Sequence, residues 1–155
     1  MAIKGEIFIE GAVQGQLEGP RENKSSLIYE FKTGVYLPLD TEYNRIQGSR
    51  QIMPFEVVKF IDRITPLLYK MICENEDCEE IRVILYRIEE TTGLETQYFK
   101  YTFKHAKIIS VENWMPPIYT STTEEIGHLE KIKFLAKEIT WTHLDGSVEF
   151  RETVF

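Results

Sequence analysis

The chain has few cysteines and histidines, and this scarcity limits the chemistry that it can perform. Among 155 residues there are two cysteines and three histidines, namely Cys73, Cys78, His105, His128 and His143. Their spacing matches no zinc site, whose ligands come in close pairs. We interpret Cys73 and Cys78 as two reduced, partly buried thiols, and a local disulfide or a redox role is the alternative. No metal or other cofactor is expected.

Long apolar runs and a signal peptide are also missing. No stretch approaches the roughly 18 consecutive apolar residues needed to span a bilayer, so membrane insertion is not expected. The N-terminal sequence MAIKGEIFIEG lacks the basic start, apolar middle and small-residue cleavage site of a signal peptide. We therefore expect assembly in the cytoplasm, followed by secretion only by a route that uses no cleaved signal.

Positive charge is in short supply. The formal net charge is −7 and the sequence pI is near 5.1, which argues against a nucleic-acid partner, because such binding needs a basic patch. Between Glu74 and Glu95, eight acidic residues stand beside only Arg82 and Arg87. We interpret this run as a solvated face, and a surface that recognises a basic partner is the alternative.

Catalytic motifs are absent as well. The chain has no G-x-S-x-G, no H-E-x-x-H and no glycine-rich phosphate cradle. Glu89 and Glu90 are adjacent, and neighbouring strand residues point to opposite faces, so this pair would not share a site. Cys73 with a distant histidine is the one nucleophile pair that the residue types allow, and no motif supports it. His143, in I-T-W-T-H, is expected to pack or to form a hydrogen bond. We predict that the protein is not an enzyme.

What the sequence does contain is a series of alternating segments typical of β-strands. Its length and its apolar fraction of 43% predict one globular domain over residues 1–155. Strands are expected at 4–10, 27–37, 54–61, 81–86, 95–111, 131–143 and 148–154. Asp145-Gly146 is a strong hairpin signal, while 38–50 and 113–128 are expected to be polar loops. The sum is a mainly β protein, and a closed or nearly closed barrel is the natural architecture.

Alternation also predicts which way individual side chains point. In the first strand, Ile7 and Ile9 should face one way and Glu6 the other. In the strand at 27–37, one face should carry the bulky apolar residues Leu27, Tyr29 and Phe31. The opposite face should carry Glu30 and Lys32.

One helix is expected, directly after the third strand. Thr65 is a good N-cap, and Pro66 suits the next position because its missing N–H has no helical partner there. An apolar stripe then follows, formed by Leu67, Leu68, Met71 and Ile72.

Four segments together resemble the haemolysin-coregulated protein (Hcp) family, the tube proteins of type VI secretion systems. They are IFIEGAVQGQ at 7–16, PFEVVKFIDRITPLLY at 54–69, YFKYTFKHAKIISV at 98–111 with Met-Pro at 115–116, and IKFLAKEITWTH at 132–143. The second segment is similar to the family's strand, lysine, aspartate and S/T-P-L-L-Y. The order of the segments fits over nearly the whole chain.

The resemblance implies a fold and an assembly. The fold is a β-barrel of two packed sheets with one short α-helix at its side, like that of phage tail-tube proteins. The assembly is a hexameric ring that stacks into a hollow tube inside a contractile sheath. Sheath contraction expels the tube with a spike protein at its tip, and effector cargo can be carried and protected in the lumen. No catalytic residue carries over. A phage-type tail tube protein and a small-ligand-binding β-barrel are the alternatives.

Two groups of residues are candidates for contacts within such a tube. The polar loop at 38–50 carries charges of both signs and is our candidate for reaching a neighbouring subunit; a solvated surface loop is the alternative. The interface residues expected there are Leu39, Asp40, Glu42, Tyr43, Arg45 and Arg50. If the strand at 27–37 lines the bore, Glu30 and Lys32 would face the lumen and its cargo.

Overall fold

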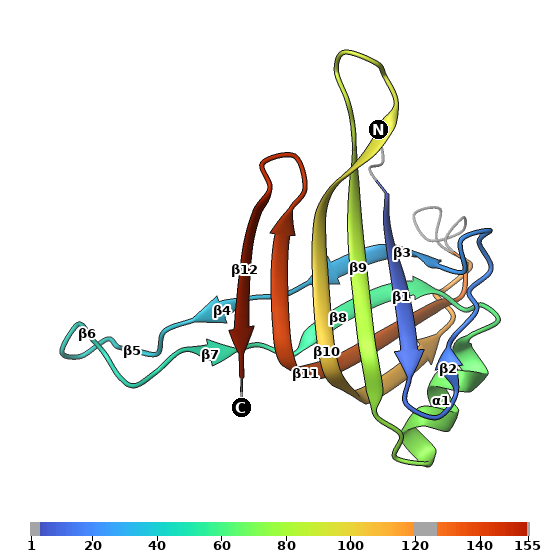
Figure 1. Cartoon of the computed structure of the whole chain (residues 1–155). Coiled ribbons are helices and arrows are strands. Elements are labelled where there is room, and N and C mark those ends of the chain that lie inside the picture. Colours follow the sequence, from blue (N-terminus) through green and yellow to red (C-terminus); the bar gives the residue numbers. More distant parts are fainter. Residues whose placement is uncertain (1–3, 120–126, 155) are drawn as a thin grey trace.

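The computed structural model of the chain describes residues 4–119 and 127–154 (Figure 1). These residues form one helix, α1 (Thr65–Cys73), and a set of strands. The strands are β1 (Gly5–Gly11), β2 (Gly15–Gln16), β3 (Ser26–Lys32), β4 (Val35–Tyr36), β5 (Leu39–Asp40), β6 (Arg45–Ile46), β7 (Gln51–Ile52), β8 (Phe55–Phe60), β9 (Cys78–Ile88), β10 (Glu95–Trp114), β11 (Leu129–His143) and β12 (Val148–Thr153). No helix in the described ranges is long and apolar enough to cross a membrane.

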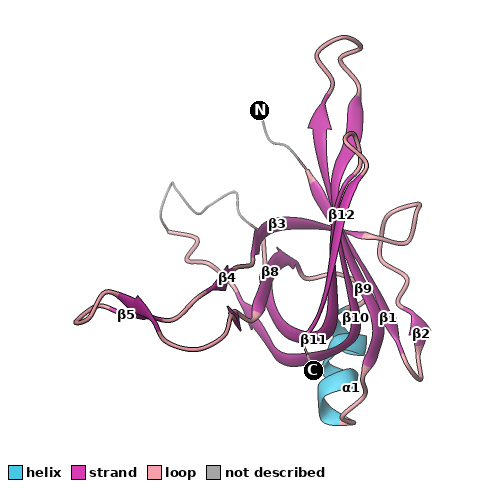
Figure 2. Ribbon diagram, turned by 60° about the vertical axis from the view of Figure 1, so that its left-hand side comes forward, coloured by secondary structure: helices cyan, strands magenta, loops and turns pink. Residues whose placement is uncertain are grey.

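Six of the strands close into a barrel in which every neighbouring pair is antiparallel. Their order around the barrel is β1, β3, β8, β11, β10 and β9, which pairs again with β1. Figure 2 shows the curled sheet with α1 against one side. The expected fold, a mainly β barrel with one short helix at its side, is therefore confirmed. Closure pairs strand edges that would otherwise be open to other chains.

β10 and β11 are the longest strands, and both extend beyond the barrel. Their register runs from Phe99 opposite His143 to Trp114 opposite Leu129. The half of β11 that begins at Leu129 also pairs with β8, and the half that ends at His143 pairs with β12. β11 therefore changes its second neighbour halfway along. In Figure 1 the β9–β10 and β11–β12 hairpins rise beyond one end of the barrel.

The interior of the barrel is filled by apolar side chains. Phe55, Phe103 and Phe134 come from β8, β10 and β11, and their ring centroids lie 4.4, 5.0 and 5.2 Å apart. Ile7 and Ile9 of β1 join the same buried cluster, as the alternation predicts. Burying a side chain of this size contributes about 1.5–3 kcal/mol relative to exposure. The centre of the barrel is thus a packed core.

α1 lies on this core, but it begins one position earlier than the sequence predicts. The expected apolar stripe is confirmed, since four residues pack on the core: Leu67, Leu68, Met71 and Ile72. The expected cap is wrong, because Ile64 occupies the N-cap position and no side chain caps the helix. Thr65 is the first helical residue and Pro66 the second. Proline is tolerated there because the N–H groups of the first turn have no helical partner.

The Thr65 hydroxyl does not cap the helix because it belongs to a buried ionic network. Lys59 Nζ lies 2.6 Å from Glu130 Oε2 and 3.0 Å from Asp62 Oδ1. Thr65 Oγ1 donates a hydrogen bond to Glu130 Oε2 at 2.9 Å and accepts one from the backbone N–H of Asp62. The side chains of Lys59 and Glu130 are completely buried. The lysine and threonine of the second family-like segment therefore converge on one carboxylate of β11, and the aspartate of that segment binds the same lysine.

A second polar joint ties the β1–β2 turn to the end of α1. The Glu76 carboxylate accepts hydrogen bonds from the backbone N–H groups of Val13 and Gln14 and from the Gln14 side chain. Gln14 also donates to the carbonyl of Leu67 in α1. Burial disfavours the charged form of Glu76, but these hydrogen bonds outweigh it and hold its pKa below the ordinary value. Gly11 permits the close approach, because a Cβ there would lie 2.7 Å from Glu76 Oε1.

Glu6 points away from the barrel interior, as the alternation predicts, yet it is buried. The segment after β2 folds over it, so that Ser25 Oγ and Asn23 Nδ2 donate hydrogen bonds to Glu6 Oε2 at 2.8 and 3.0 Å. The Tyr86 hydroxyl donates to Oε1, and Arg21 Nε lies 3.8 Å from Oε2. Burial raises the pKa of Glu6, but the hydrogen bonds and the arginine lower it further, so its pKa lies below the ordinary value.

The two expected connections at the C-terminal end have different outcomes. The hairpin at Asp145-Gly146 is confirmed, since β11 and β12 are joined by a turn over residues 144–147. The expected loop at 113–128 is shorter than predicted, because β10 continues to Trp114. Residues 120–126, which include the S-T-T-E-E segment, lie outside the described residues.

The buried Lys59–Glu130 pair gives a direct test of this part of the fold. We expect Lys59→Met to lower the free energy of unfolding by about 3–5 kcal/mol, because it leaves the Glu130 carboxylate buried without a counter-ion. Lys59→Met/Glu130→Leu should recover most of that loss, because both charges are then gone. Urea unfolding of the three proteins measures this. A single variant as stable as the wild type would contradict the buried pair.

Candidate assembly surfaces

The segment expected to be a polar loop is an ordered two-stranded arm. β4 pairs with β7 and β5 pairs with β6, so residues 33–54 form a long hairpin interrupted by a bend. Figures 1 and 2 show this arm projecting sideways from the barrel. The prediction that 38–50 is a polar loop is therefore wrong in part, because β5 and β6 lie within it. The sequence does not reveal the strands of the arm, because each has only two residues and is too short to show an alternating pattern.

The arm carries many apolar side chains that its own chain does not cover. Leu39 and Ile46 lie directly opposite each other and are 56% and 59% exposed, and Tyr43 at the tip is 67% exposed. Four further apolar residues of the arm are exposed: Val35, Tyr36, Leu37 and Met53. The sequence interpretation emphasised the charges of this segment and missed these four. The signal available in the sequence was the apolar content of the loop itself, since Leu39, Tyr43 and Ile46 lie within 38–50.

The tip of the arm is held in shape by Asp40. Its Oδ1 accepts hydrogen bonds from the backbone N–H groups of Glu42 and Tyr43 at 3.0 and 3.4 Å. Its Oδ2 accepts one from the Gln47 side chain at 3.0 Å and lies 3.9 Å from Arg45 Nε. The Arg45 guanidinium also stands over the Tyr43 ring, 5.3 Å from its centroid. The structure therefore brings five of the six expected interface residues together at the outer half of the arm.

Arg50, the sixth expected interface residue, lies apart from the others. It is near the root of the arm, and its guanidinium faces β12 of its own chain. Arg50 Nη2 donates to Glu152 Oε1 at 3.1 Å and to the carbonyl of Thr153 at 3.0 Å. The residue thus has partners within the chain that the sequence did not predict.

Glu30 and Lys32 are both exposed on β3, but the expected faces of this strand are wrong. Leu27 and Tyr29 were expected to share the inner apolar face with Phe31, and instead they are 43% and 59% exposed. The register against β8 shifts between Ile28 and Glu30. A bulge of this kind breaks the two-residue alternation, so Ile28 and Phe31 pack on the core.

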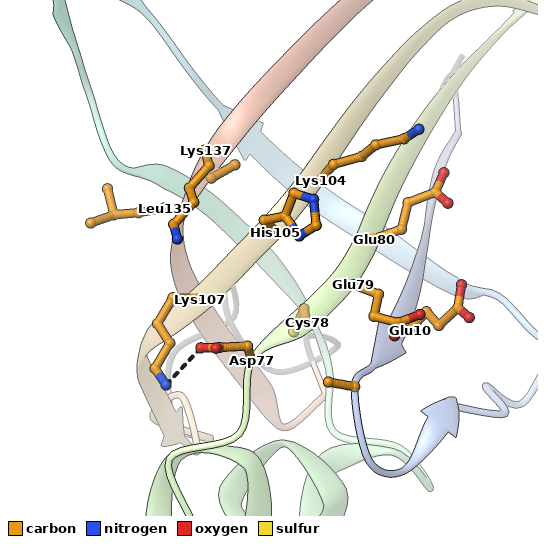
Figure 3. A pocket seen from close by; sticks show the side chains of 12 residues that line it. Glu10, Asp77, Cys78, Glu79, Glu80, Lys104, His105, Lys107, Leu135 and Lys137 are labelled. Carbon is orange, nitrogen blue, oxygen red and sulfur yellow. Dashed lines mark hydrogen bonds and ion pairs between the residues drawn. The ribbon is translucent and has the colours of Figure 1, made fainter. Parts of the chain in front are cut away.

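A surface hollow of about 770 Å³ lies across β9, β10 and β11. Figure 3 shows its charged lining, in which Lys104 extends toward Glu80 and Lys107 meets Asp77. Carboxylates come from β1 and β9, and they are Glu10, Glu79 and Glu80. Ammonium groups come from β10 and β11, and they are Lys104, Lys107 and Lys137. Asp77 bridges to Lys107 at 2.9 Å, which holds the pKa of the Asp77 carboxyl below its ordinary value.

Cys78 and His105 both line this hollow, yet they do not form a nucleophile pair. The Cys78 side chain is buried, and its Sγ contacts the sulfur of Met71 at 3.7 Å. Burial, together with the nearby charges of Glu76 and Asp77, raises the pKa of the Cys78 thiol to about 12. A thiol must ionise to act as a nucleophile, so this one stays inert at neutral pH.

Among the described residues, Cys73 and the side chains able to bind metals also form no reactive site. Cys73 is exposed and is not joined to Cys78. Within residues 4–119 and 127–154, no three His, Cys, Asp or Glu side chains are grouped so as to hold a metal ion. Glu89 and Glu90 lie in the turn after β9, not within a strand as expected. His143 accepts a hydrogen bond from the backbone N–H of Gly146 at 3.0 Å, which confirms its expected hydrogen-bonding role.

The acidic residues between Glu74 and Glu95 make different contacts. Glu76 holds the β1–β2 turn, Asp77 pairs with Lys107, and Glu95 pairs with Lys4 at 2.8 Å. These acidic residues therefore lie at different places on the fold and do not form one continuous face.

These features define the class of the molecule. It is a closed antiparallel β-barrel with a packed interior, one flanking helix and an exposed arm. Residues 1–143 match the family model described as "Type VI secretion system effector, Hcp". The chain therefore belongs to the Hcp family of type VI secretion proteins, which is a family of secreted tube proteins and not of enzymes.

Individual relatives agree with this assignment over almost the full length. The chain is 24% identical to the "Major exported protein" of Pseudomonas aeruginosa, covering 98% of this chain and 90% of the relative. Its fold is similar to a crystal structure of an Hcp protein, with a TM-score of 0.91, 20% identity and 99% of each chain covered. A mutant of Hcp1 from E. coli EAEC 042 gives a TM-score of 0.86 at 23% identity, over 99% of this chain and 100% of that one.

The contrast between the two cysteines can be measured directly. We expect a thiol reagent to modify one cysteine per native chain, Cys73, at every pH from about 6 to 9, because the pKa of Cys78 lies near 12. After unfolding in guanidinium, two thiols should react. Cys73→Ser is the control and should leave no reactive thiol in the native protein. Rapid native modification of Cys78 would contradict its burial.

Proposed function

We propose that this protein is the structural subunit of the inner tube of a type VI secretion system. Six copies form a ring, and rings stack into a hollow tube. Contraction of the surrounding sheath expels the tube with a spike protein at its tip, and effectors travel in its lumen. Assembly takes place in the cytoplasm, and the assembled tube is then exported. The family membership and the full-length similarity to Hcp structures support this proposal.

The observation that carries the proposal is the uncovered apolar arm. Leu39 and Ile46 form a cross-strand pair far from the barrel core, and both remain more than half exposed. Contiguous exposed apolar surface on a folded protein marks an interaction site. Burial of this surface against a neighbour would stabilise the contact by about 25 cal/mol for each Å² of apolar area removed from water.

A ring built with this arm satisfies the symmetry of a single repeated chain. In a heterologous contact, one patch of a subunit meets a different patch of the next, and repetition of that contact closes a ring when the rotation allows it. The arm supplies the first patch, because it projects from the barrel (Figure 1). The barrel of the next subunit supplies the second.

The charge of the assembly affects stacking more than ring formation. Each copy has a formal charge of −7, so the six copies of a ring together carry −42 (6 × −7). Repulsion on this scale is screened by salt over about 8–10 Å at physiological ionic strength. Rings therefore dominate in dilute solution, and longer tubes require high protein concentration, added salt or the sheath and baseplate.

Two alternatives are less well supported. A small-ligand-binding barrel needs an internal apolar cavity, whereas Phe55, Phe103 and Phe134 fill the centre of this barrel. A phage-type tail tube would share the fold, but the matching family model is that of the type VI system.

The arm can be tested with a cross-strand double variant. We expect Leu39→Ser/Ile46→Ser to weaken assembly at least about tenfold, because it removes apolar area that only a neighbour can bury. Its free energy of unfolding should stay within about 0.5 kcal/mol of the wild type, because both side chains are exposed. Light scattering after size exclusion gives the mass, and the wild type should appear at six times 18.2 kDa.

A matched control separates the arm from general loss of surface apolarity. Leu94→Ser and Val148→Ser alter side chains that are 66% and 65% exposed elsewhere on the molecule, and we expect full assembly from each. A wild-type protein that stays at 18.2 kDa up to millimolar concentration would contradict the ring. Rings formed equally well by the arm variant would contradict the role of the arm.

Glu30 and Lys32 of β3 are proposed to face the lumen. Both are exposed, and their neighbours Leu27 and Tyr29 are exposed beside them. Lys32→Glu should change which effectors co-purify with the ring while the ring mass stays the same, because the charge facing the cargo is reversed. Mass spectrometry of the co-purified proteins measures this. An unchanged cargo profile in the variant would argue against a lumen position.

A further inference from the structure

Beyond its backbone continuation of the β3–β8 ladder, the arm is bonded to the rest of the described chain through one side chain. Within the described part of the chain, the hydrogen bonds and ion pairs of residues 35–49 stay inside the arm, as those of Asp40 do. Arg50 is different, because its bonds to Glu152 and Thr153 span 102 and 103 residues of sequence and reach β12. We call this contact the clasp. An arginine bound to a carboxylate and a carbonyl is a charge-assisted contact with a defined direction.

The surroundings of the clasp are loosely packed. A hollow of about 310 Å³ lies between the root of the arm and the barrel, lined by Arg50, Ile52, Phe55, Leu135 and Val154 among others. Ile52 packs on the core, whereas the hollow lies between the residues next to it, Ser49 to Gln51, and Leu135 and Ala136 of β11. The backbone ladder joins the root of the arm to β3 and β8, and the clasp adds the side-chain contact that restricts the angle of the arm relative to β12.

The other end of the clasp is held firmly. Glu152 pairs with Ile139 in the β11–β12 ladder. The backbone N–H of Val154 donates to the carbonyl of Lys137 at 2.7 Å, and the Val154 side chain packs on the core. The arm is thus tied to a strand that is paired with β11 and anchored on the core through Val154.

We propose that Arg50 is a positioning residue for assembly and not a contact residue: the Arg50–Glu152 clasp holds the arm at the angle at which it meets the next copy of the chain. This inference rests on the proposed function. A segment held in its binding geometry before contact loses less conformational freedom on docking, and affinity rises accordingly. The clasp also makes the C-terminal strand part of the assembly machinery without any contact to the neighbour.

Charge reversal distinguishes positioning from direct contact. Arg50→Glu and Glu152→Arg should each weaken assembly at least about tenfold, because each places like charges at the clasp. Arg50→Glu/Glu152→Arg should regain at least about fivefold over either single variant, because the opposite charges meet again within one chain. Arg151→Glu is the matched control, since Arg151 is the neighbouring exposed residue of β12 and pairs with Glu138. It should assemble like the wild type.

The angle of the arm is measured in the same variants below the assembly concentration. Spin labels at Tyr43→Cys and Leu94→Cys, in a Cys73→Ser background, report the distance between arm tip and barrel. We expect a narrow distance distribution in the wild type, a broad one in Arg50→Glu and a narrow one again in the double reversal. Unfolding in urea checks that each variant is folded.

Three results would overturn the clasp. The first is an Arg50→Glu variant that assembles normally, and the second is one whose arm distances stay narrow. The third is a double reversal that fails to assemble better than either single variant, which would place Arg50 against the neighbour. A wild-type protein that forms no rings would contradict the proposed function, and the spin-label distances would still decide whether the clasp holds the arm.

Discussion

The pairing of β10 with β11 is the constraint on which the rest of the structure depends. It closes the barrel, because these strands are the two ends of the path that runs through β9, β1, β3 and β8. It also places Phe103 beside Phe134, so that the rings of the core meet. Beyond the barrel the same two strands continue, and β11 there pairs with β12. The platform to which the arm is clasped exists because this ladder is longer than the barrel.

Two buried carboxylates attach the remaining elements to that frame. Glu130 of β11 receives Lys59 and Thr65, which fixes the start of α1. Glu76 receives the β1–β2 turn, which fixes the other end of the helix region through Gln14. The partners of each carboxylate lie in a segment that resembles the Hcp family, with Lys59 and Thr65 in 54–69 and Gln14 in 7–16, so part of those two segments has a structural explanation. Buried charges are strongly destabilising when one partner is removed, so each joint ties its elements firmly to the barrel.

Much of this fold follows from local patterns, and the failures have definite physical causes. Alternation correctly places Ile7 and Ile9 inside, because β1 is regular and one of its faces meets the core. Alternation fails in β3, because a bulge between Ile28 and Glu30 shifts the faces and a bulge depends on the partner strand.

Long-range contacts account for the other errors. Thr65 resembles an N-cap, but its hydroxyl is taken by Glu130, which is distant in sequence. Glu6 is buried only because residues 21–25 fold over it. The position and charge of the arm residues Leu39 to Arg45 led to the expectation that they lie at an interface. The partner of Arg50 could not be inferred from the sequence, because Glu152 is 102 residues away.

In the proposed tube, this chain is a building block whose function lies in repetition. The barrel supplies rigidity, the arm supplies an apolar surface that one copy cannot cover, and the clasp sets the direction in which that surface is offered. The most direct test is negative-stain electron microscopy of the purified wild-type protein. The account predicts doughnut-shaped particles with six-fold class averages. A field of isolated small particles at every concentration and salt condition would contradict it.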